Sequence, residues 1–173
     1  MKKNKLINIG ILGGTFDPPH KGHLSISINA RKKFKLKKII WAVTNRSPFK
    51  RKTSMDINER IKLSKKITKN KNFIKVGFFE KKINSNKTIN LITYFQKKYK
   101  DHNLYFIMGA DNLINFHKWY KWREISSKCI ILVFDRKGYK TKSLKSISYK
   151  YLNKKAIIFV NFKKVNISSS KLR

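Results

Sequence analysis

The sequence predicts an α/β protein with a doubly wound, mainly parallel sheet and helices on both faces. Six short apolar runs rich in Ile, Val and Phe are mostly continuous, which is typical of strands buried on both faces. Helix-like stretches separate several of these runs, and strands that alternate with helices indicate βαβ units. Neither an internal repeat nor a Gly/Ser-rich or Pro-rich linker interrupts the pattern, so we expect residues 1–173 to form a single domain.

The predicted elements follow one another in strand and helix order. The first helix carries Leu24, Ile28 and Ala30 on one side and ends in cations, which suit the C-terminal end of the helix dipole. Ser54 is the expected N-cap of the second helix. In such folds ligands bind beyond the carboxyl ends of the strands, so the segments after the strands are the expected site. The expected strands are Leu6–Leu12, Ile39–Thr44, Phe73–Phe79, Leu104–Met108, Ile130–Phe134 and Ala156–Val160, and the expected helices are His23–Phe34, Met55–Lys69 and Thr88–Lys98.

The composition is strongly basic. Lys and Arg total 43 against 8 Asp and Glu, which gives a formal net charge of +35. Such a charge attracts polyanions, including nucleic acid and ATP. However, Lys greatly outnumbers Arg and is spread along the whole chain, whereas a dedicated nucleic-acid surface concentrates its cations on one element. Compositional drift is therefore favoured over selected polyanion binding, and both interpretations stay open.

Cysteine usage and hydropathy favour the cytosol. The apolar runs are all much shorter than the ~20 residues that a bilayer requires. The basic N-terminus imitates a secretory signal, but its apolar stretch Leu6–Leu12 contains Asn8 and leads into Gly13 without a small-residue cleavage site, so a buried strand explains it better. Cys129 is the only cysteine and lies in an apolar run, which favours a core residue over a reactive thiol.

The segment after the first strand, GGTFDPPHKGHL, has the features of a phosphate-binding turn. Gly13 and Gly14 remove side chains where the backbone would approach a ligand. The amides around Gly14, Thr15 and Phe16 are candidate donors to phosphate oxygens. Asp17 is the expected cap of the following helix, and the two prolines after it fix the entry of the chain into that helix. The segment is not a P-loop, because no Lys-Ser/Thr pair follows the glycines.

Two histidines in this segment point to phosphate chemistry. His20 and His23 are three residues apart and therefore share a face of a helical turn, which Gly22 leaves open at the positive end of the helix. Two imidazoles there can donate hydrogen bonds to a triphosphate as charge shifts onto departing pyrophosphate. Such a transfer depends on positioning and electrostatics and needs no covalent enzyme intermediate. A metal pair and plain surface residues are the alternatives; a metal site would need a third ligand, and His102 and His117 have no evident link to this pair.

These residues resemble the nucleotidyltransferase superfamily whose adenylyltransferase signature is GxFDPxHxGH. The resemblance implies a Rossmann-like sheet, ATP as substrate, a divalent cation, usually Mg²⁺, and release of pyrophosphate. It also implies that His20 and His23 are catalytic, binding the triphosphate and stabilising the transition state. Pantetheine-phosphate adenylyltransferases and several cytidylyltransferases share the histidine signature, so it indicates the reaction type rather than the acceptor. The ATP-binding residues expected from these segments are Gly13, Gly14, Thr15, Phe16, Gly22, Gly109 and Asp111.

A second segment, MGADNLINFHKWYKWREI, narrows the choice of acceptor. A strand that ends at Gly109 places Asp111 beside the site, where its carboxylate can hold a ribose hydroxyl or a water of the cation. The aromatic residues that follow either pack between helices, which their spacing alone favours, or offer flat surfaces to an aromatic ring. The order GxD…FxxWxxW…I resembles the nicotinate-nucleotide adenylyltransferases, which implies that Trp119 stacks on the pyridine ring and that the Tyr120 amide meets the nicotinate carboxylate. The aromatic cluster consists of Phe116, Trp119, Tyr120 and Trp122.

Two further segments match this family with departures. The resemblance assigns Thr88 to the nicotinate carboxylate, within Asn-Lys-Thr at 86–88 where the family usually has Ser-Tyr-Thr. An N-cap role is the alternative for this threonine, and the two roles are compatible. After the second strand, Asn45 and Lys50 are expected to bind nicotinate mononucleotide, with a solvated loop as the alternative. Phe49 stands where the family commonly has a histidine.

The C-terminal residues ISSSKLR, at 167–173, resemble the family's Ile-Ser-Ser-Thr-x-Ile-Arg. In the family, hydroxyls, helix-terminal amides and the arginine grip the phosphates of ATP. The resemblance therefore adds Ser168, Ser169, Ser170 and Arg173 to the expected ATP-binding residues. A disordered Ser/Lys tail is the alternative.

The sequence thus predicts a cytoplasmic adenylyltransferase that transfers AMP from ATP, with Mg²⁺, to nicotinate mononucleotide in NAD biosynthesis. Its expected partners are the two nucleotides, with no specific nucleic acid and no membrane. Two related acceptors, nicotinamide mononucleotide and phosphopantetheine, stay open, and a basic nucleic-acid-binding module is the alternative from another functional class.

Overall fold

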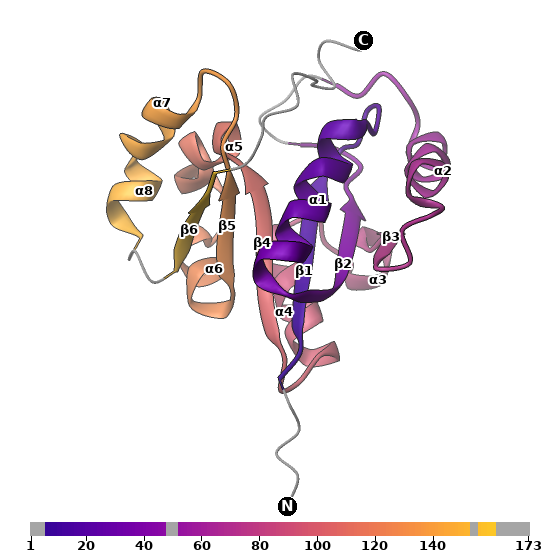
Figure 1. Ribbon diagram of the computed structural model, residues 1–173, viewed down its shortest axis with the longest axis horizontal. Helices are drawn as coiled ribbons and strands as arrows, with labels where there is room; N and C mark the ends of the chain where they lie inside the picture. The colour runs from indigo at the N-terminus through magenta and orange to yellow at the C-terminus, as the bar shows by residue number, and fades with distance from the viewer. Residues whose placement is uncertain (1–5, 48–51, 153–155, 162–173) are drawn as a thin grey trace, which may run out of the picture.

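The computed structural model describes residues 6–47, 52–152 and 156–161. Its centre is a six-stranded sheet in the order β3-β2-β1-β4-β5-β6, in which every neighbouring pair is parallel (Figure 1). The predicted doubly wound α/β architecture is confirmed. The strands are β1 (Asn8–Gly14), β2 (Leu36–Val43), β3 (Ile74–Phe78), β4 (Asn103–Gly109), β5 (Ile130–Phe134) and β6 (Ile157–Val160).

Helices connect the strands and cover both faces of the sheet, with α1 in front of β1 and β2 in Figure 1 and α4 behind them. The three long helices correspond to the predicted ones within two residues at each end. The shorter elements were not predicted, because three to seven residues cannot display a helical period. The helices are α1 (Lys21–Phe34), α2 (Ile57–Thr68), α3 (Glu80–Ile83), α4 (Thr88–Lys98), α5 (Ala110–Ile114), α6 (Trp122–Lys128), α7 (Lys140–Leu144) and α8 (Ile147–Tyr151), with a 3₁₀ helix η1 (Phe116–Lys118).

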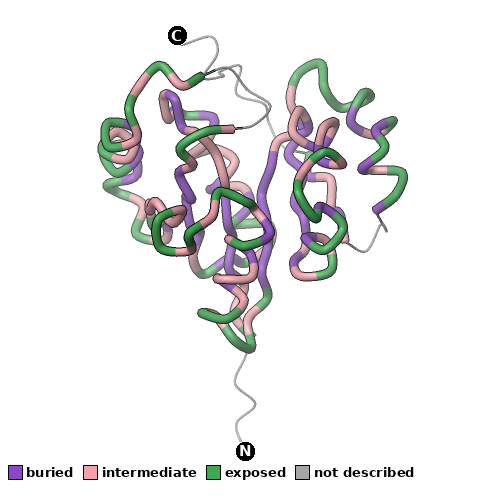
Figure 2. Tube along the Cα trace, turned by 180° about the vertical axis from the view of Figure 1, so that it is seen from behind, coloured by how far each residue is buried: buried purple, intermediate pink, exposed green. Residues whose placement is uncertain are grey.

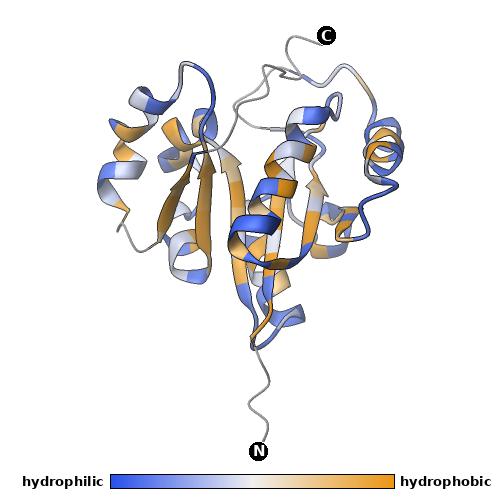
Figure 3. Ribbon diagram, viewed as in Figure 1, coloured by the Kyte–Doolittle hydropathy of each residue, from blue (hydrophilic) through white to orange (hydrophobic). Residues whose placement is uncertain are grey.

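The sheet separates two hydrophobic layers, and neighbouring residues of a strand face different layers. On β2, Ile39, Trp41 and Val43 join the layer under α1 and α2, whereas Ile40 and Ala42 join the layer under α4. Buried residues therefore run along the central strands (Figure 2), and the strands are the most hydrophobic part of the molecule (Figure 3). Because both faces are covered, the strands read as continuous apolar runs in the sequence.

Two predicted helix caps are wrong. His20, not Asp17, is the N-cap of α1, and Asp56, not Ser54, is the N-cap of α2, where its Oδ1 accepts from the amides of two residues in the first turn. Asp17 instead accepts hydrogen bonds from the backbone and hydroxyl of Ser54. Both predictions failed because a side chain that caps its own helix and one that braces a distant loop look alike in the sequence.

Cys129 is a core residue, as predicted. Its side chain is 8% exposed, and its Sγ donates to the carbonyl of Ile125 at 3.3 Å. Burial raises the pKa of the Cys129 thiol to about 12. Thiolate is therefore scarce at neutral pH, which excludes this cysteine as a ready nucleophile. Within the described residues, no helix is long and apolar enough to cross a membrane.

Candidate active site

The segments that were expected to form the site meet at the carboxyl edge of the sheet, which lies at the top of Figure 1. The chain runs from β1 through α1 to β2 on one side of the sheet, and β4 pairs with β1 on its other side. The strand order therefore changes direction between β1 and β4, and ligands of doubly wound proteins bind outside such a switch point. The turn after β1, including Gly13, Gly14 and Thr15, opens onto it.

The two histidines cap α1 reciprocally. His20 has extended backbone angles, and its Nδ1 accepts from the Gly22 amide at 3.0 Å. The Nδ1 of His23 accepts from the His20 amide at 3.2 Å, and the two ring centroids lie 3.9 Å apart. Because both Nδ1 atoms accept, a neutral imidazole in either position carries its proton on Nε2. The pair therefore holds two N–H donors side by side at the start of the helix.

Gly22 has a narrower role than a phosphate-binding amide. Its N–H is already bonded to His20, and the residue is buried. The Gly22 amide is therefore committed to His20, and the predicted contribution of Gly22 to ATP binding is that it places no side chain beside the site.

Burial and a nearby cation keep His20 neutral. The residue is 9% exposed, and burial first, with the positive charge of Arg136 second, lowers its pKa from 6.5 to about 4. The neutral ring can accept from Gly22 at one nitrogen and donate from the other. A bound polyphosphate would oppose both causes of the shift, since its negative charge favours the imidazolium form.

An aromatic stack supports the histidine pair from below. Phe16 is 1% exposed, and its ring lies 4.8 Å from Trp41 in a stacked arrangement and 4.8 Å from His23. The Nε1 of Trp41 donates to the hydroxyl of Ser27 at 2.8 Å, which ties the stack to α1. The Phe16 side chain therefore belongs to the core, and only its backbone is available for the ATP contact that was predicted.

A buried arginine joins the turns after β1 and β2. Arg60 is fully buried on α2, and its guanidinium donates to the carbonyls of Thr15 at 2.7 Å, Thr44 at 2.8 Å and Asn45 at 3.1 Å. Its Nε also donates to the backbone just before α2. Burial lowers the pKa of Arg60, and three carboxylates, of which Asp17 acts most strongly, oppose that shift. Arg60 thus donates to five carbonyls and attaches the turns after β1 and β2 to α2.

Asp17 completes this brace from the other side. It is fully buried, and its carboxylate accepts from the Ser54 amide at 2.8 Å, the Ser54 hydroxyl at 2.9 Å and the Met55 amide at 3.1 Å. The turn after β1 is consequently attached to the segment that leads into α2. A carboxylate that accepts several such bonds holds a loop in place rather than a ligand.

The first turn of α5, directly after β4, carries a carboxylate next to a second cation. Arg136, just after β5, donates to Asp111 Oδ2 at 2.6 Å. A Cβ atom on Gly109 would collide with the Asp111 carboxylate, which explains the glycine at the end of β4. The positive charge of Arg136 also contributes to the lowered pKa of His20. Arg136 was not among the residues predicted from the sequence, although its place just after a predicted strand was the available signal.

A cavity of about 630 Å³ lies beside the turn after β1. Its walls come from the turns after β1 and β2, the segment from β3 into α4, and the segment around η1. Six of the predicted site residues line it, and the two histidines do not. The cavity and the histidine pair are neighbours along the chain. Gly14, before Thr15, lines the cavity, and Phe16, after it, contacts His23. The predicted residues that line the cavity are Gly13, Gly14, Thr15, Thr88, Trp119 and Tyr120.

The aromatic cluster divides between packing and cavity. Phe116 and Trp122 are buried in the core, as the packing alternative expected. Trp119 and Tyr120 line the cavity instead, and the Trp119 ring stands edge-on to Phe106, 6.1 Å away. The packing interpretation is therefore confirmed for Phe116 and Trp122, and the ring-binding interpretation stays a prediction for Trp119 and Tyr120.

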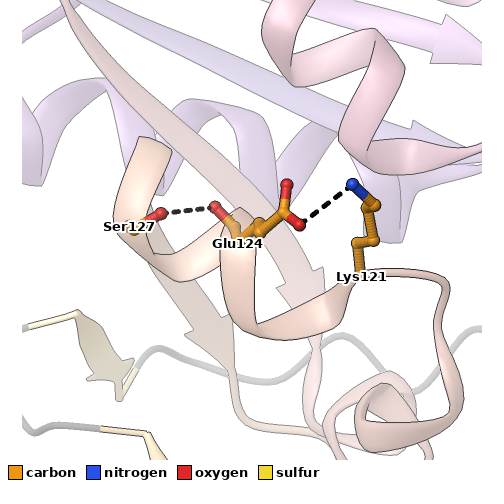
Figure 4. A network of polar contacts seen from close by, with 3 residues as sticks. All are labelled: Lys121, Glu124 and Ser127. Carbon is orange, nitrogen blue, oxygen red and sulfur yellow. Dashed lines mark hydrogen bonds and ion pairs between the residues drawn. The ribbon is translucent and has the colours of Figure 1, made fainter.

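Helix α6 begins directly after the cavity wall. Lys121 adopts a left-handed backbone (φ 50°) and forms an ion pair with Glu124 at 3.1 Å (Figure 4). The Ser127 hydroxyl donates to the Glu124 carbonyl one turn later, at 2.8 Å. The ion pair is half-exposed, so its contribution to stability is small. The left-handed residue turns the chain sharply between Tyr120 and Trp122, which separates the exposed ring from the buried one.

Thr88 and Asn45 have partly different positions from those expected. The N-cap of α4 is Lys87, so the N-cap alternative for Thr88 is wrong and Thr88 is the first helical residue, lining the cavity. Asn45 lies just outside the cavity wall and is exposed, and its amide donates to Glu80 Oε1 at 3.1 Å. The predictions for Lys50 and for the C-terminal ATP-binding residues lie outside the described residues, as does Phe49. Those C-terminal residues are Ser168, Ser169, Ser170 and Arg173.

Comparison with known proteins assigns the family. A family model described as cytidylyltransferase-like matches residues 11–173. A Pelagibacter ubique (strain HTCC1062) protein named "Probable nicotinate-nucleotide adenylyltransferase" is 62% identical over 169 residues, covering 98% of this chain and 93% of the relative. The chain belongs to the nicotinate-nucleotide adenylyltransferases. These nucleotidyltransferases form part of the cytidylyltransferase-like family.

Further relatives of this adenylyltransferase agree in sequence and fold. A Rhizobium meliloti (strain 1021) protein of the same name is 36% identical over 131 residues, covering 75% of this chain and 69% of the relative. The Plasmodium falciparum nicotinic acid mononucleotide adenylyltransferase complexed with NaAD has the same fold. It superimposes with a TM-score of 0.71 at 18% identity, over 95% of this chain and 82% of that structure.

Proposed function

We propose that this adenylyltransferase transfers AMP from ATP to nicotinate mononucleotide, giving nicotinate adenine dinucleotide and pyrophosphate. The observation that carries the proposal is a pair of imidazoles 3.9 Å apart at the start of α1, beside an aromatic-walled cavity of about 630 Å³. A neighbouring donor pair and cavity are what the reaction requires, because the triphosphate and the acceptor must meet at one phosphorus atom.

The transfer is a direct displacement. A phosphate oxygen of the acceptor attacks the α-phosphorus of ATP, the bond from that phosphorus to the bridging oxygen breaks, and pyrophosphate leaves with the electron pair. His20 and His23 donate from Nε2 to the phosphate oxygens on which charge accumulates. Because these donors are held by the reciprocal cap before ATP arrives, little reorganisation is needed during the reaction. The amides of Gly14 and Thr15 add donors on the same side.

Arg136 and Asp111 serve the ATP side of the site. Arg136 contributes a positive charge near His20, and Asp111 holds a ribose hydroxyl or a water of the metal ion. Mg²⁺ is bound in most enzymes through substrate phosphates and one or two carboxylates, and a single carboxylate such as Asp111 fits that pattern. When bound, the ion neutralises charge on the triphosphate. Gly109 gives the Asp111 carboxylate its space.

The acceptor occupies the cavity. Trp119 stacks on the pyridine ring, and the Tyr120 amide and Thr88 meet the nicotinate carboxylate. Asn45 and Lys50 lie on the segment after β2, where they approach the mononucleotide. We further propose that residues 1–173 act as one domain in the cytoplasm, and that Ser168, Ser169, Ser170 and Arg173 contact the ATP phosphates.

An acceptor panel tests the function. Purified protein, ATP and Mg²⁺ are combined separately with nicotinate mononucleotide, nicotinamide mononucleotide and phosphopantetheine, and pyrophosphate release is measured. The proposal expects the highest kcat/KM for nicotinate mononucleotide, with nicotinate adenine dinucleotide as the product by mass. Pyrophosphate release with none of the three acceptors would refute adenylyl transfer, whereas a preference for phosphopantetheine would refute the proposed acceptor.

A further inference from the structure

Three basic side chains line the acceptor cavity from three separate segments. Arg46 follows β2, Lys87 precedes α4 and Lys118 lies in η1. None of them was identified as a site residue from the sequence, because lysines occur throughout this chain. Their convergence on one cavity is a property of the fold.

The cavity therefore carries an excess of positive charge. Of the described residues that line it, Glu80 alone is a carboxylate. Its Oε1 is already occupied, because it accepts a short hydrogen bond from the Thr44 hydroxyl and a second from the Asn45 amide at 3.1 Å. The three cations in the wall therefore outnumber this one carboxylate, and the excess positive charge favours a bound anion.

Lys87 has the most favourable position for an anionic ring substituent. It is the N-cap of α4, an eleven-residue helix whose first residue, Thr88, also lines the cavity. The amides of the first helical turn and the dipole of the helix favour negative charge at this end. The Lys87 ammonium adds a full positive charge at the same end of the helix. Lys87, Thr88 and Trp119 all line the cavity.

The Lys87 side chain has no structural duty within the described part of the chain. Its backbone is committed, since its amide donates to the Ser85 hydroxyl at 3.1 Å and its carbonyl accepts from Asn90 and Leu91. The side chain is exposed and forms no ion pair among the described residues. A lysine stands here where the family motif that the segment resembles usually has a tyrosine.

We propose that Lys87 is a specificity-determining residue, whose ammonium favours an acceptor with a carboxylate on the ring over the same acceptor with a carboxamide. The inference rests on the proposed function and adds a source of selectivity to it. A backbone amide distinguishes the two groups only weakly, because a carboxamide oxygen also accepts hydrogen bonds. A cation distinguishes them by charge.

The test compares kcat/KM for nicotinate and nicotinamide mononucleotides in Lys87→Gln and in a matched control. Lys97→Gln is the control, because Lys97 is an exposed lysine at the opposite end of α4 and does not line the cavity. We expect Lys87→Gln to lower the nicotinate-to-nicotinamide ratio about fivefold, the size of a single exposed ion pair. Lys87→Arg should retain the ratio, Lys87→Glu should lower it further, and added salt should lower the wild-type ratio.

The failures of the two proposals are distinguishable. If the wild type used neither mononucleotide, the proposed function would fail before any variant was compared. If the wild type preferred nicotinate mononucleotide and Lys87→Gln kept that preference, the inference alone would be wrong. An equal loss with both acceptors would also overturn it, since Lys87 would then contact a group that the two share. Circular dichroism of each variant verifies that the fold is retained.

Discussion

The turn after β1 and the acceptor cavity are built in opposite ways. The turn is local: His20 and His23 contact each other and Gly22 within four residues of sequence. The cavity is assembled from segments between Gly13 and Tyr120, which only the fold brings together. The comparison indicates that the chemistry of transfer is encoded by a short motif, whereas the choice of acceptor depends on tertiary structure.

Arg60 links the two regions. It contacts Thr15 and Thr44, which both line the cavity, and Thr15 directly precedes Phe16, whose ring contacts His23. The spacing between the histidine pair and the acceptor cavity therefore depends on Arg60, to which the proposed function assigns no contact with either substrate. Four substitutions separate the regions experimentally.

Replacing His23 with alanine should have the largest effect. We expect His23→Ala to lower kcat about a thousandfold with every acceptor, because a donor to the developing charge is lost. Pyrophosphate release measures it. His102→Ala is the control, since His102 stacks on Tyr99 just before β4, at the opposite edge of the sheet. Wild-type turnover in His23→Ala would contradict the catalytic role.

Replacing Arg60 with methionine should disturb both regions through stability. We expect Arg60→Met to lower the free energy of unfolding by about 3 kcal/mol, because five carbonyls lose the buried guanidinium that donates to them. Urea denaturation gives the value. Lys62→Met, on the exposed side of the same helix, should change stability by less than about 0.5 kcal/mol. Equal stability of the two variants would show that the arginine does not brace the turns.

Replacing His20 with asparagine should change how stability depends on pH. The folded pKa of His20 is about 4 and the unfolded value is 6.5, so its contribution is present above pH 6.5 and is lost as the pH falls towards 4. Asparagine caps helices well but does not titrate. The stability difference between wild type and His20→Asn should therefore decrease by about 2 kcal/mol between pH 7 and pH 5. Parallel urea-denaturation profiles would show that burial does not depress this pKa.

Replacing Trp119 with alanine should affect only the cavity. We expect Trp119→Ala to raise KM for nicotinate mononucleotide about tenfold, because the stacking surface is removed. KM for ATP should stay unchanged, and Trp119→Phe should recover most of the affinity. Steady-state kinetics with each substrate varied in turn measure these values. An increase in both KM values would show that Trp119 supports the whole site and is not an acceptor contact.

The predictability of each part follows the same division. The sheet was predictable because strands covered on both faces appear as unbroken apolar runs, as in Ile130–Phe134. The proximity of the two histidines was predictable from their spacing, but the structure brings the rings together through the reciprocal cap between His20 and His23 and not through a shared helical face. Trp119 was separable from Trp122 only by family resemblance, because both are aromatic residues near a short helix.

The residues that sequence reasoning missed act across long distances. Arg60 binds carbonyls 15 to 45 residues away, and Arg136 pairs with a carboxylate 25 residues away. No pattern in a lysine-rich sequence distinguishes such cations from solvated ones. The prediction of Asp17 as a helix cap failed for the same reason, since its partners Ser54 and Met55 lie 37 and 38 residues along the chain.

The burial of Cys129 supplies a built-in reporter of opening. The residue lies between α6 and β5. The ion pair of Asp111 and Arg136 joins the segments that follow β4 and β5. A thiol reagent reaches its sulfur only when this part of the core exposes it, so the labelling rate counts openings of the native protein. Because the chain has one cysteine, every labelling event reports the same place.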